Sequence, residues 1–151
     1  RSGHPSLYVK RGGEYERLKQ YDLAIRDHER ALKIKPDMID AMIGLAKCYY
    51  KISDRVLSDH WIERAETFNA DNDYDAMLKE CGLFALYVQI GDMDKAQEMA
   101  ERLDQHAAEH TRLQGWLASD ADFAPVRGEK WFKKIMARLS VAELQSSQQG
   151  D

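Results

Sequence analysis

The feature that most constrains the fold is a self-similarity with a period of 34 residues. Tyr15 recurs as Tyr49 and Ala31 recurs as Ala65, both at this interval. A repeat of this length is one supersecondary unit, which cannot bury its apolar face alone and folds by stacking on its neighbours. Stacked arrays leave an inner surface free for a partner, so the period indicates binding instead of catalysis.

Composition favours a soluble helical chain. Of 151 residues, 44% are hydrophobic, 32% are charged and only 3 are proline, and no useful strand alternation occurs. The net charge of −4 comes without a basic stripe, which argues against nucleic acid or acidic lipid as partner. No apolar run reaches the roughly 20 residues of a membrane span, and the first residues do not resemble a signal peptide. We expect a cytoplasmic protein, unless the chain, which begins at Arg1, is a fragment that has lost a signal or anchor.

The first unit, residues 5–38, carries the motif most clearly. Aromatic, small and closing residues occur in a fixed order: Tyr8, Gly12, Tyr15, Ala24, Ala31 and Pro36. This order resembles the tetratricopeptide repeat family. Small residues allow two helices to approach closely, and the proline cannot continue the second helix. Two positions depart from the family pattern, since Arg11 stands where an apolar residue is usual and Lys19 where a turn glycine is usual.

The two later units are more divergent. The second, residues 39–72, has Ser58 at the central alanine, and its hydroxyl must bond to a carbonyl if it is buried. The third, residues 77–110, is shifted by four residues, because Tyr49 is answered by Tyr87. Four residues make about one helical turn, so we expect a longer first helix to absorb them without changing its buried face.

The period is lost after residue 110. The run from Asp120 to Arg127, followed by Trp131 and Phe132, resembles the closing segment of many bacterial tetratricopeptide proteins. We expect capping helices over residues 111–145, which cover the open apolar end of the last repeat, and a frayed tail over 146–151. The predicted fold is all-α: a right-handed α-solenoid of about three helix-turn-helix units with a helical cap, in a single domain over 1–151.

The resemblance implies that the first helices of the units line a concave groove, which binds a peptide or helix of another protein. Mapping the family's groove positions gives Val9, Gly13, Glu16, Arg17, Ile43, Lys47, Tyr50, Lys51, Cys81, Ala85, Val88 and Gln89. Apolar members would anchor an apolar side chain of the partner, and the cations would meet acidic groups. The alternative is that these are ordinary exposed residues and that binding uses the convex side or an edge. The clamp that co-chaperones use for heat-shock protein termini is absent, since Val9, Gly13 and Gly44 occupy clamp positions.

No sequence pattern indicates an enzyme, a cofactor or a metal. Nucleophile elbows, phosphate loops and dinucleotide fingerprints are missing. His106 and His110 lie one helical turn apart, but two ligands alone make a weak metal site, and solvated surface histidines are the simpler interpretation. Asp71, Asp73 and Asp75 alternate as in an EF-hand loop, without its glycine and closing glutamate. We therefore predict no catalytic residue, no cofactor and no metal ligand.

The two cysteines, Cys48 and Cys81, are interpreted as small buried hydrophobes in a reducing compartment, because no CxxC or nearby histidine suggests a zinc site. The predicted function is that of a protein–protein interaction scaffold or adaptor. Two alternatives remain open. One is a self-assembling structural module that forms homo-oligomers, and the other is a regulatory domain of a larger enzyme.

Overall fold

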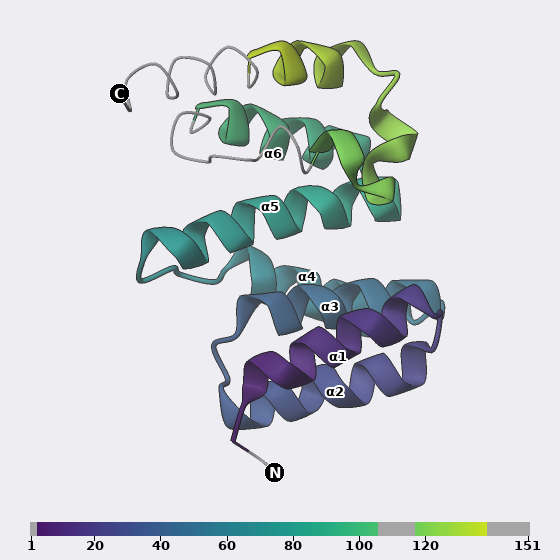
Figure 1. Ribbon diagram of the computed structural model, residues 1–151, viewed down its shortest axis with the longest axis vertical. Helices are drawn as coiled ribbons and strands as arrows, with labels where there is room; N and C mark the ends of the chain where they lie inside the picture. The colour runs from purple at the N-terminus through teal and green to yellow at the C-terminus, as the bar shows by residue number, and fades with distance from the viewer. Residues whose placement is uncertain (1–2, 106–116, 139–151) are drawn as a thin grey trace. The chain divides into compact units, whose positions relative to one another are not determined.

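The fold was analysed in a computed structural model, which describes residues 3–105 and 117–138. The described elements are α1 (Pro5–Arg17), α2 (Tyr21–Ile34), α3 (Ile39–Lys51), α4 (Arg55–Glu66), α5 (Asp73–Ile90), α6 (Met93–Gln105) and the 3-10 helix η2 (Ala121–Val126) (Figure 1). Residues 117–119 and 130–138 are also helical, and the described residues contain no strand. The predicted all-α helical-repeat fold is confirmed.

The chain divides into two compact units, an N-terminal unit of residues 1–82 and a C-terminal unit of residues 83–151. In the N-terminal unit, α1 packs on α2 and α3 packs on α4, each pair as an antiparallel hairpin (Figure 1). α2 also packs on α3, and α1 touches α3. α1 begins at Pro5 and α3 at Ile39, so the period of 34 residues is the distance between equivalent helices.

Local signals in the sequence set the starts of the helices. Pro5 occupies the first turn of α1, where its missing N–H costs no hydrogen bond. Asp54 caps α4 by accepting from the Leu57 amide at 3.1 Å. Asn72 and Asp92 accept amide bonds at the starts of α5 and α6 in the same way, at 2.8 and 3.2 Å. Each such cap satisfies a backbone donor that the helix itself leaves unpaired.

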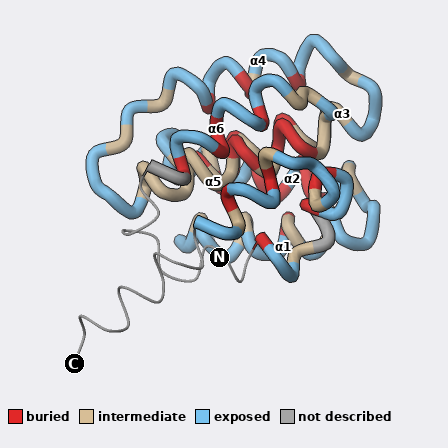
Figure 2. The backbone as a smooth tube through the Cα atoms, turned by 90° about the horizontal axis from the view of Figure 1, so that it is seen from above, coloured by how far each residue is buried: buried red, intermediate tan, exposed pale blue. Residues whose placement is uncertain are grey.

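Small residues form the contact surface between the helices of the N-terminal unit. Seven core residues of this unit have no exposed surface: Ala24, Ala31, Ala41, Leu45, Ala46, Cys48 and Ala65. Figure 2 shows buried positions gathered where helices face each other, with exposed positions outward. Ser58 is also buried, and its hydroxyl donates to the carbonyl of Ala46 at 2.8 Å. The hydroxyl has therefore found the carbonyl acceptor that the sequence required.

The periodic tyrosines end the first helix of every repeat through their backbone carbonyls. Each carbonyl accepts the amide five residues on: Gln20 to Tyr15 at 2.8 Å, Asp54 to Tyr49 at 2.9 Å and Asp92 to Tyr87 at 2.9 Å. A second bond accompanies each, as from Lys19 to Glu16 at 2.9 Å. This pair of bonds is the Schellman motif, in which one residue adopts a left-handed conformation.

The left-handed residue of each turn is Lys19, Ser53 or Gly91, with φ angles of 59°, 67° and 80°. Lys19 thus has the backbone conformation that favours glycine, as the family pattern suggested. The first two turns contain a residue with a Cβ atom where the third has none. The first two repeats therefore carry a backbone strain that the third repeat avoids.

α5 is the longest helix described, with 18 residues against 13 in α1 and α3. The longer first helix expected from the four-residue shift is confirmed. In the C-terminal unit, Phe84 of α5 stacks on Phe123 at 5.3 Å between ring centroids, and Trp131 meets the edge of Phe84 at 6.3 Å. The expected capping segment thus supplies aromatic rings to the core of this unit. Its remaining parts, residues 106–116 and 139–151 with the predicted frayed tail, lie outside the described residues.

Candidate functional site

The predicted groove residues of α1 and α3 lie on two helices that touch each other. Six of them are partly buried: Val9, Gly13, Glu16, Ile43, Lys47 and Tyr50. Arg17 and Lys51, the last residues of the two helices, are exposed. Arg17 forms an ion pair with Glu14 on its own helix.

An ion pair joins the two helices on this side. Nζ of Lys47 lies 2.9 Å from Oε1 of Glu16, and the two side chains are 27% and 11% exposed. Further along α3, the guanidinium of Arg55 lies 4.1 Å from the ring centroid of Tyr50. The structure therefore brings together predicted groove residues from the first two repeats.

The predicted groove residues of α5 fall in both units. Cys81 is partly buried in the N-terminal unit, where burial raises the pKa of its thiol to about 12. The neighbouring Gly82 packs on Ile43, because a Cβ atom at Gly82 would lie 2.4 Å from Cδ1 of Ile43. In the C-terminal unit, Ala85 and Gln89 are partly buried and Val88 is buried. α5 is thus fitted closely to α3 at its Gly82 position.

A buried histidine lies beneath the α1–α3 contact. His28 of α2 is 1% exposed. A Cβ atom at Gly12 would lie 2.8 Å from Cε1 of the ring, and one at Gly44 would lie 2.5 Å from Nε2. The imidazole is therefore held between the backbones of α1 and α3, and only glycine leaves room for it at these two positions.

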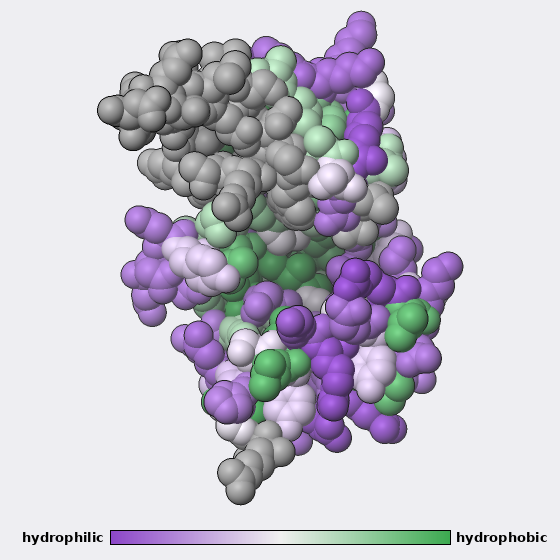
Figure 3. Space-filling model, viewed as in Figure 1, coloured by the Kyte–Doolittle hydropathy of each residue, from purple (hydrophilic) through white to green (hydrophobic). Residues whose placement is uncertain are grey.

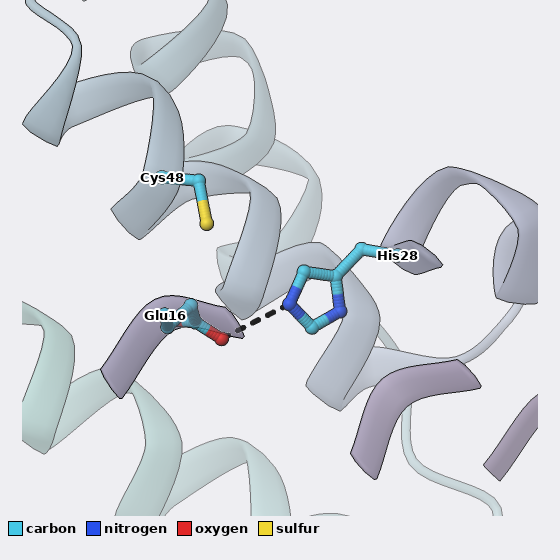
Figure 4. A group of neighbouring side chains, drawn as sticks. All are labelled: Glu16, His28 and Cys48. Atoms are coloured by element: carbon cyan, nitrogen blue, oxygen red, sulfur yellow. Dashed lines mark hydrogen bonds and ion pairs between the residues drawn. The ribbon is translucent and has the colours of Figure 1, made fainter. Parts of the chain in front are cut away.

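His28 belongs to a polar cluster that also contains Glu16, Lys47 and Cys48. Nε2 of His28 lies 3.0 Å from Oε2 of Glu16. The carboxylate, one ring nitrogen of His28 and the buried thiol of Cys48 all lie within 4.8 Å of one another. Figure 4 shows the sulfur and the Nε2 edge of the ring turned toward the carboxylate. Three helices thus converge on one small group of polar atoms.

The protein environment shifts the pKa values of two members of the cluster. Burial opposes the ionisation of Glu16, but the interactions with His28 and Lys47 outweigh it, so the pKa of this carboxyl is below its usual value. Burial, assisted by the Glu16 charge, raises the pKa of the Cys48 thiol to about 12. Nδ1 of His28 is a buried atom with no hydrogen-bond partner in the described residues. The cluster therefore combines a carboxylate, a neutral thiol and a half-satisfied imidazole.

A second ion pair, with only its acidic partner buried, joins α1 and α2. Arg11 donates two hydrogen bonds to Asp27, from Nε to Oδ2 and from Nη2 to Oδ1, both at 2.7 Å. Asp27 is 2% exposed, whereas the side chain of Arg11 is 51% exposed. The guanidinium also lies 5.7 Å from the ring centroid of Tyr8. Arg11, which stands where the repeat family usually has an apolar residue, is thus paired with the buried carboxylate of Asp27 on the facing helix.

Sequence reasoning did not assemble the polar cluster, although one signal was available. The repeat pattern places an aromatic residue four positions after its first conserved alanine. Here that alanine is Ala24, and the position is occupied by His28. A polar residue at a core position of the repeat needs a polar partner, and the helices that pack on α2, α1 and α3, are where that partner is expected.

Paired antiparallel helices at 34-residue spacing, joined by Schellman turns, define a helical-repeat protein. Residues 5–38 match the family model described as tetratricopeptide repeat, so the first helix pair is a repeat of this family. Such repeats generally mediate protein–protein interactions and are typically non-enzymatic. No solved structure gave a significant match. Within residues 3–105 and 117–138, none of the helices combines the length and apolarity that crossing a membrane requires.

Proposed function

We propose that the chain is an adaptor that binds a peptide or helix of a partner protein along the α1–α3 face. The ion pair between Glu16 and Lys47 supports this proposal most directly, because it holds the first helices of two repeats side by side. A preformed scaffold of this kind loses little conformational entropy when it binds.

Charges at one end of this face favour an acidic partner. Arg17 and Lys51 occupy equivalent positions, one repeat apart, and both are exposed at the C-terminal ends of their helices. Tyr50 adds a partly exposed aromatic ring next to Lys51. We infer that a carboxylate of the partner meets Lys51 and replaces Glu14 at Arg17, and that an apolar side chain contacts the tyrosine.

Paired variants test the proposed face. Tyr50→Ala combined with Lys51→Glu removes the ring and reverses one charge without touching the Glu16–Lys47 ion pair. Lys33→Glu, on the exposed side of α2, makes a similar charge change elsewhere. Affinity capture with quantitative mass spectrometry should show proteins that are lost with the double variant and retained with Lys33→Glu, at unchanged helical content. Equal capture by the double variant and the wild type would place binding on another face.

Self-assembly is a second candidate, favoured by apolar side chains on α1 and at its C-terminal end. Leu7 in α1 and Leu18, directly after the helix, are 61% and 66% exposed. In the lower part of Figure 3, the surface of the N-terminal unit is mostly hydrophilic with separate hydrophobic patches. Association through α1 would make the sedimentation coefficient rise with concentration, and Leu18→Lys would suppress the rise. A strictly monomeric wild-type chain would contradict self-assembly.

A further inference from the structure

We propose that Glu16, His28 and Cys48 bind a zinc ion. Their ligand atoms lie within 4.8 Å of one another and come from three helices, α1, α2 and α3. Carboxylate oxygen, imidazole nitrogen and thiolate sulfur are the three donor types that zinc uses in proteins. The site is distinct from the proposed partner contacts at Arg17, Tyr50 and Lys51.

The geometry requires movements of the side chains of about an ångström. Zinc lies about 2.0–2.3 Å from its ligands, so tetrahedral donors are roughly 3.3–3.8 Å apart. Nε2 of His28 and Oε2 of Glu16 are 3.0 Å apart, so the ion would replace their hydrogen bond and the two atoms would separate slightly. Gly12 and Gly44 fix the imidazole on both sides, which leaves the thiol and carboxylate to close on the ion. Three protein ligands leave a fourth coordination position for water.

Two anionic ligands compensate the charge of the ion. The Glu16 carboxylate and the Cys48 thiolate together carry two negative charges against a divalent ion, and the Lys47 ammonium beside Glu16 leaves one positive charge over. Zinc takes the lone pair of Nε2 of His28, so a ring proton then lies on Nδ1, the ring nitrogen without a hydrogen-bond partner in the described residues. Cys48 binds as the thiolate, so its thiol proton is released to solvent.

Lys47 gives the proposed site a distinctive dependence on charge. Its Nζ lies 2.9 Å from Oε1 of Glu16, which leaves Oε2 for the ion. The ammonium repels a cation bound at the same carboxylate. Lys47→Gln should therefore tighten zinc binding by at least about twofold.

Cobalt absorption and zinc competition test the proposal on the whole chain. With Co²⁺ as probe, the wild type should take up one equivalent with a thiolate-to-cobalt charge-transfer band. Zinc affinity is then measured by competition with a chromophoric chelator. Cys48→Ser should abolish the band and weaken zinc binding at least about tenfold, whereas Cys81→Ser should change neither. A wild-type chain without the band, or a band that survives in Cys48→Ser, would overturn the proposal.

Two further variants separate this site from folding defects and from other histidines. Glu16→Gln preserves the size of a partly exposed side chain, so it decides the question if Cys48→Ser loses helical content by circular dichroism. It should weaken zinc binding at least about tenfold, and unchanged affinity would overturn the proposal. His106→Ala with His110→Ala should leave affinity unaltered. Binding lost in that pair and kept in Glu16→Gln would also overturn it.

Discussion

Gly44 of α3 is in direct contact with His28 of α2, because a Cβ atom on this glycine would lie 2.5 Å from Nε2 of the ring. Real Cβ atoms do not approach so closely. The ring cannot retreat easily, since Gly12 of α1 closes its other side at 2.8 Å. The identity of residue 44 is thus coupled to a side chain of the preceding repeat.

Gly44→Ala should therefore destabilise the protein, although alanine is the better helix former. We expect a loss of about 1–3 kcal/mol in the free energy of unfolding, typical of an overpacked core, measured by urea denaturation. Gly13→Ala is the matched control, because a Cβ atom there meets nothing within 4 Å. The control should gain up to about 1 kcal/mol from helix propensity. Equal effects of the two substitutions would show that the ring moves freely.

Lys19→Gly and Ser53→Gly should each stabilise the protein. Both residues have positive φ angles, 59° and 67°, which cost a residue with a Cβ atom about 1 kcal/mol or more. Part of the gain is cancelled by the greater freedom of glycine in the unfolded chain, so we expect about 0.5–1 kcal/mol per site. Thermal unfolding measures it. Gly91→Ala, at φ 80°, should shift stability in the opposite direction, and a gain there would contradict the argument.

Arg11→Leu should destabilise the protein even though it restores the apolar residue that the repeat family prefers. The substitution leaves Asp27, 2% exposed, without its bidentate partner. We expect a loss of about 1–3 kcal/mol, the usual effect of an unsatisfied buried polar group. In the double variant with Asp27→Leu, the second change should recover much of that loss. Additive losses in this double-mutant cycle would mean that the two side chains act independently.

Tyr49 should make stability fall at high pH. Burial, assisted by the charge of Glu29, raises the pKa of this phenol from 10.0 to about 12, and its hydroxyl donates to Oε1 of Glu29 at 3.2 Å. The folded state therefore favours the neutral phenol. The contribution of Tyr49 is complete below pH 10, where both states are protonated. It is lost as pH rises toward 12, because the unfolded state releases its proton first.

Tyr49→Phe removes this dependence and serves as the comparison. The difference in free energy of unfolding between wild type and variant should shrink between pH 10 and 12, as measured by urea denaturation at several pH values. The other titrating groups are common to both proteins and cancel in the difference. A difference that stays constant from pH 8 to pH 11.5 would show that Tyr49 titrates as an ordinary exposed phenol.

The repeat was predictable because its determinants are local and periodic. The first helices end close to the periodic tyrosines Tyr15, Tyr49 and Tyr87. The increase in tyrosine spacing from 34 to 38 residues predicted the longer α5. Ser58 could be assigned a carbonyl acceptor because a buried hydroxyl leaves few choices. These inferences depend on spacing along one helix or between neighbouring helices.

The polar cluster was not predictable in the same way. Glu16, His28 and Cys48 share no recognisable spacing, and their proximity depends on how α1, α2 and α3 pack. Glu16 and Lys47 were predicted as groove residues that would meet a partner, whereas in the structure they pair with each other. The position of a residue on a helix predicts the direction of its side chain, but it does not predict which neighbouring side chain it will contact.

The turn built on the tyrosine carbonyl fixes the end of a first helix independently of the residue at which that helix begins. Its amides bond only to carbonyls in the last turn of the helix, so residues added at the beginning of the helix do not disturb these hydrogen bonds. α5 illustrates this, since it is longer than α1 and α3 and ends in the same turn. Whole helical turns can therefore be added at the start of a first helix without changing its connection to the second helix. The length of a repeat can thus differ between natural proteins and can be altered in designed ones.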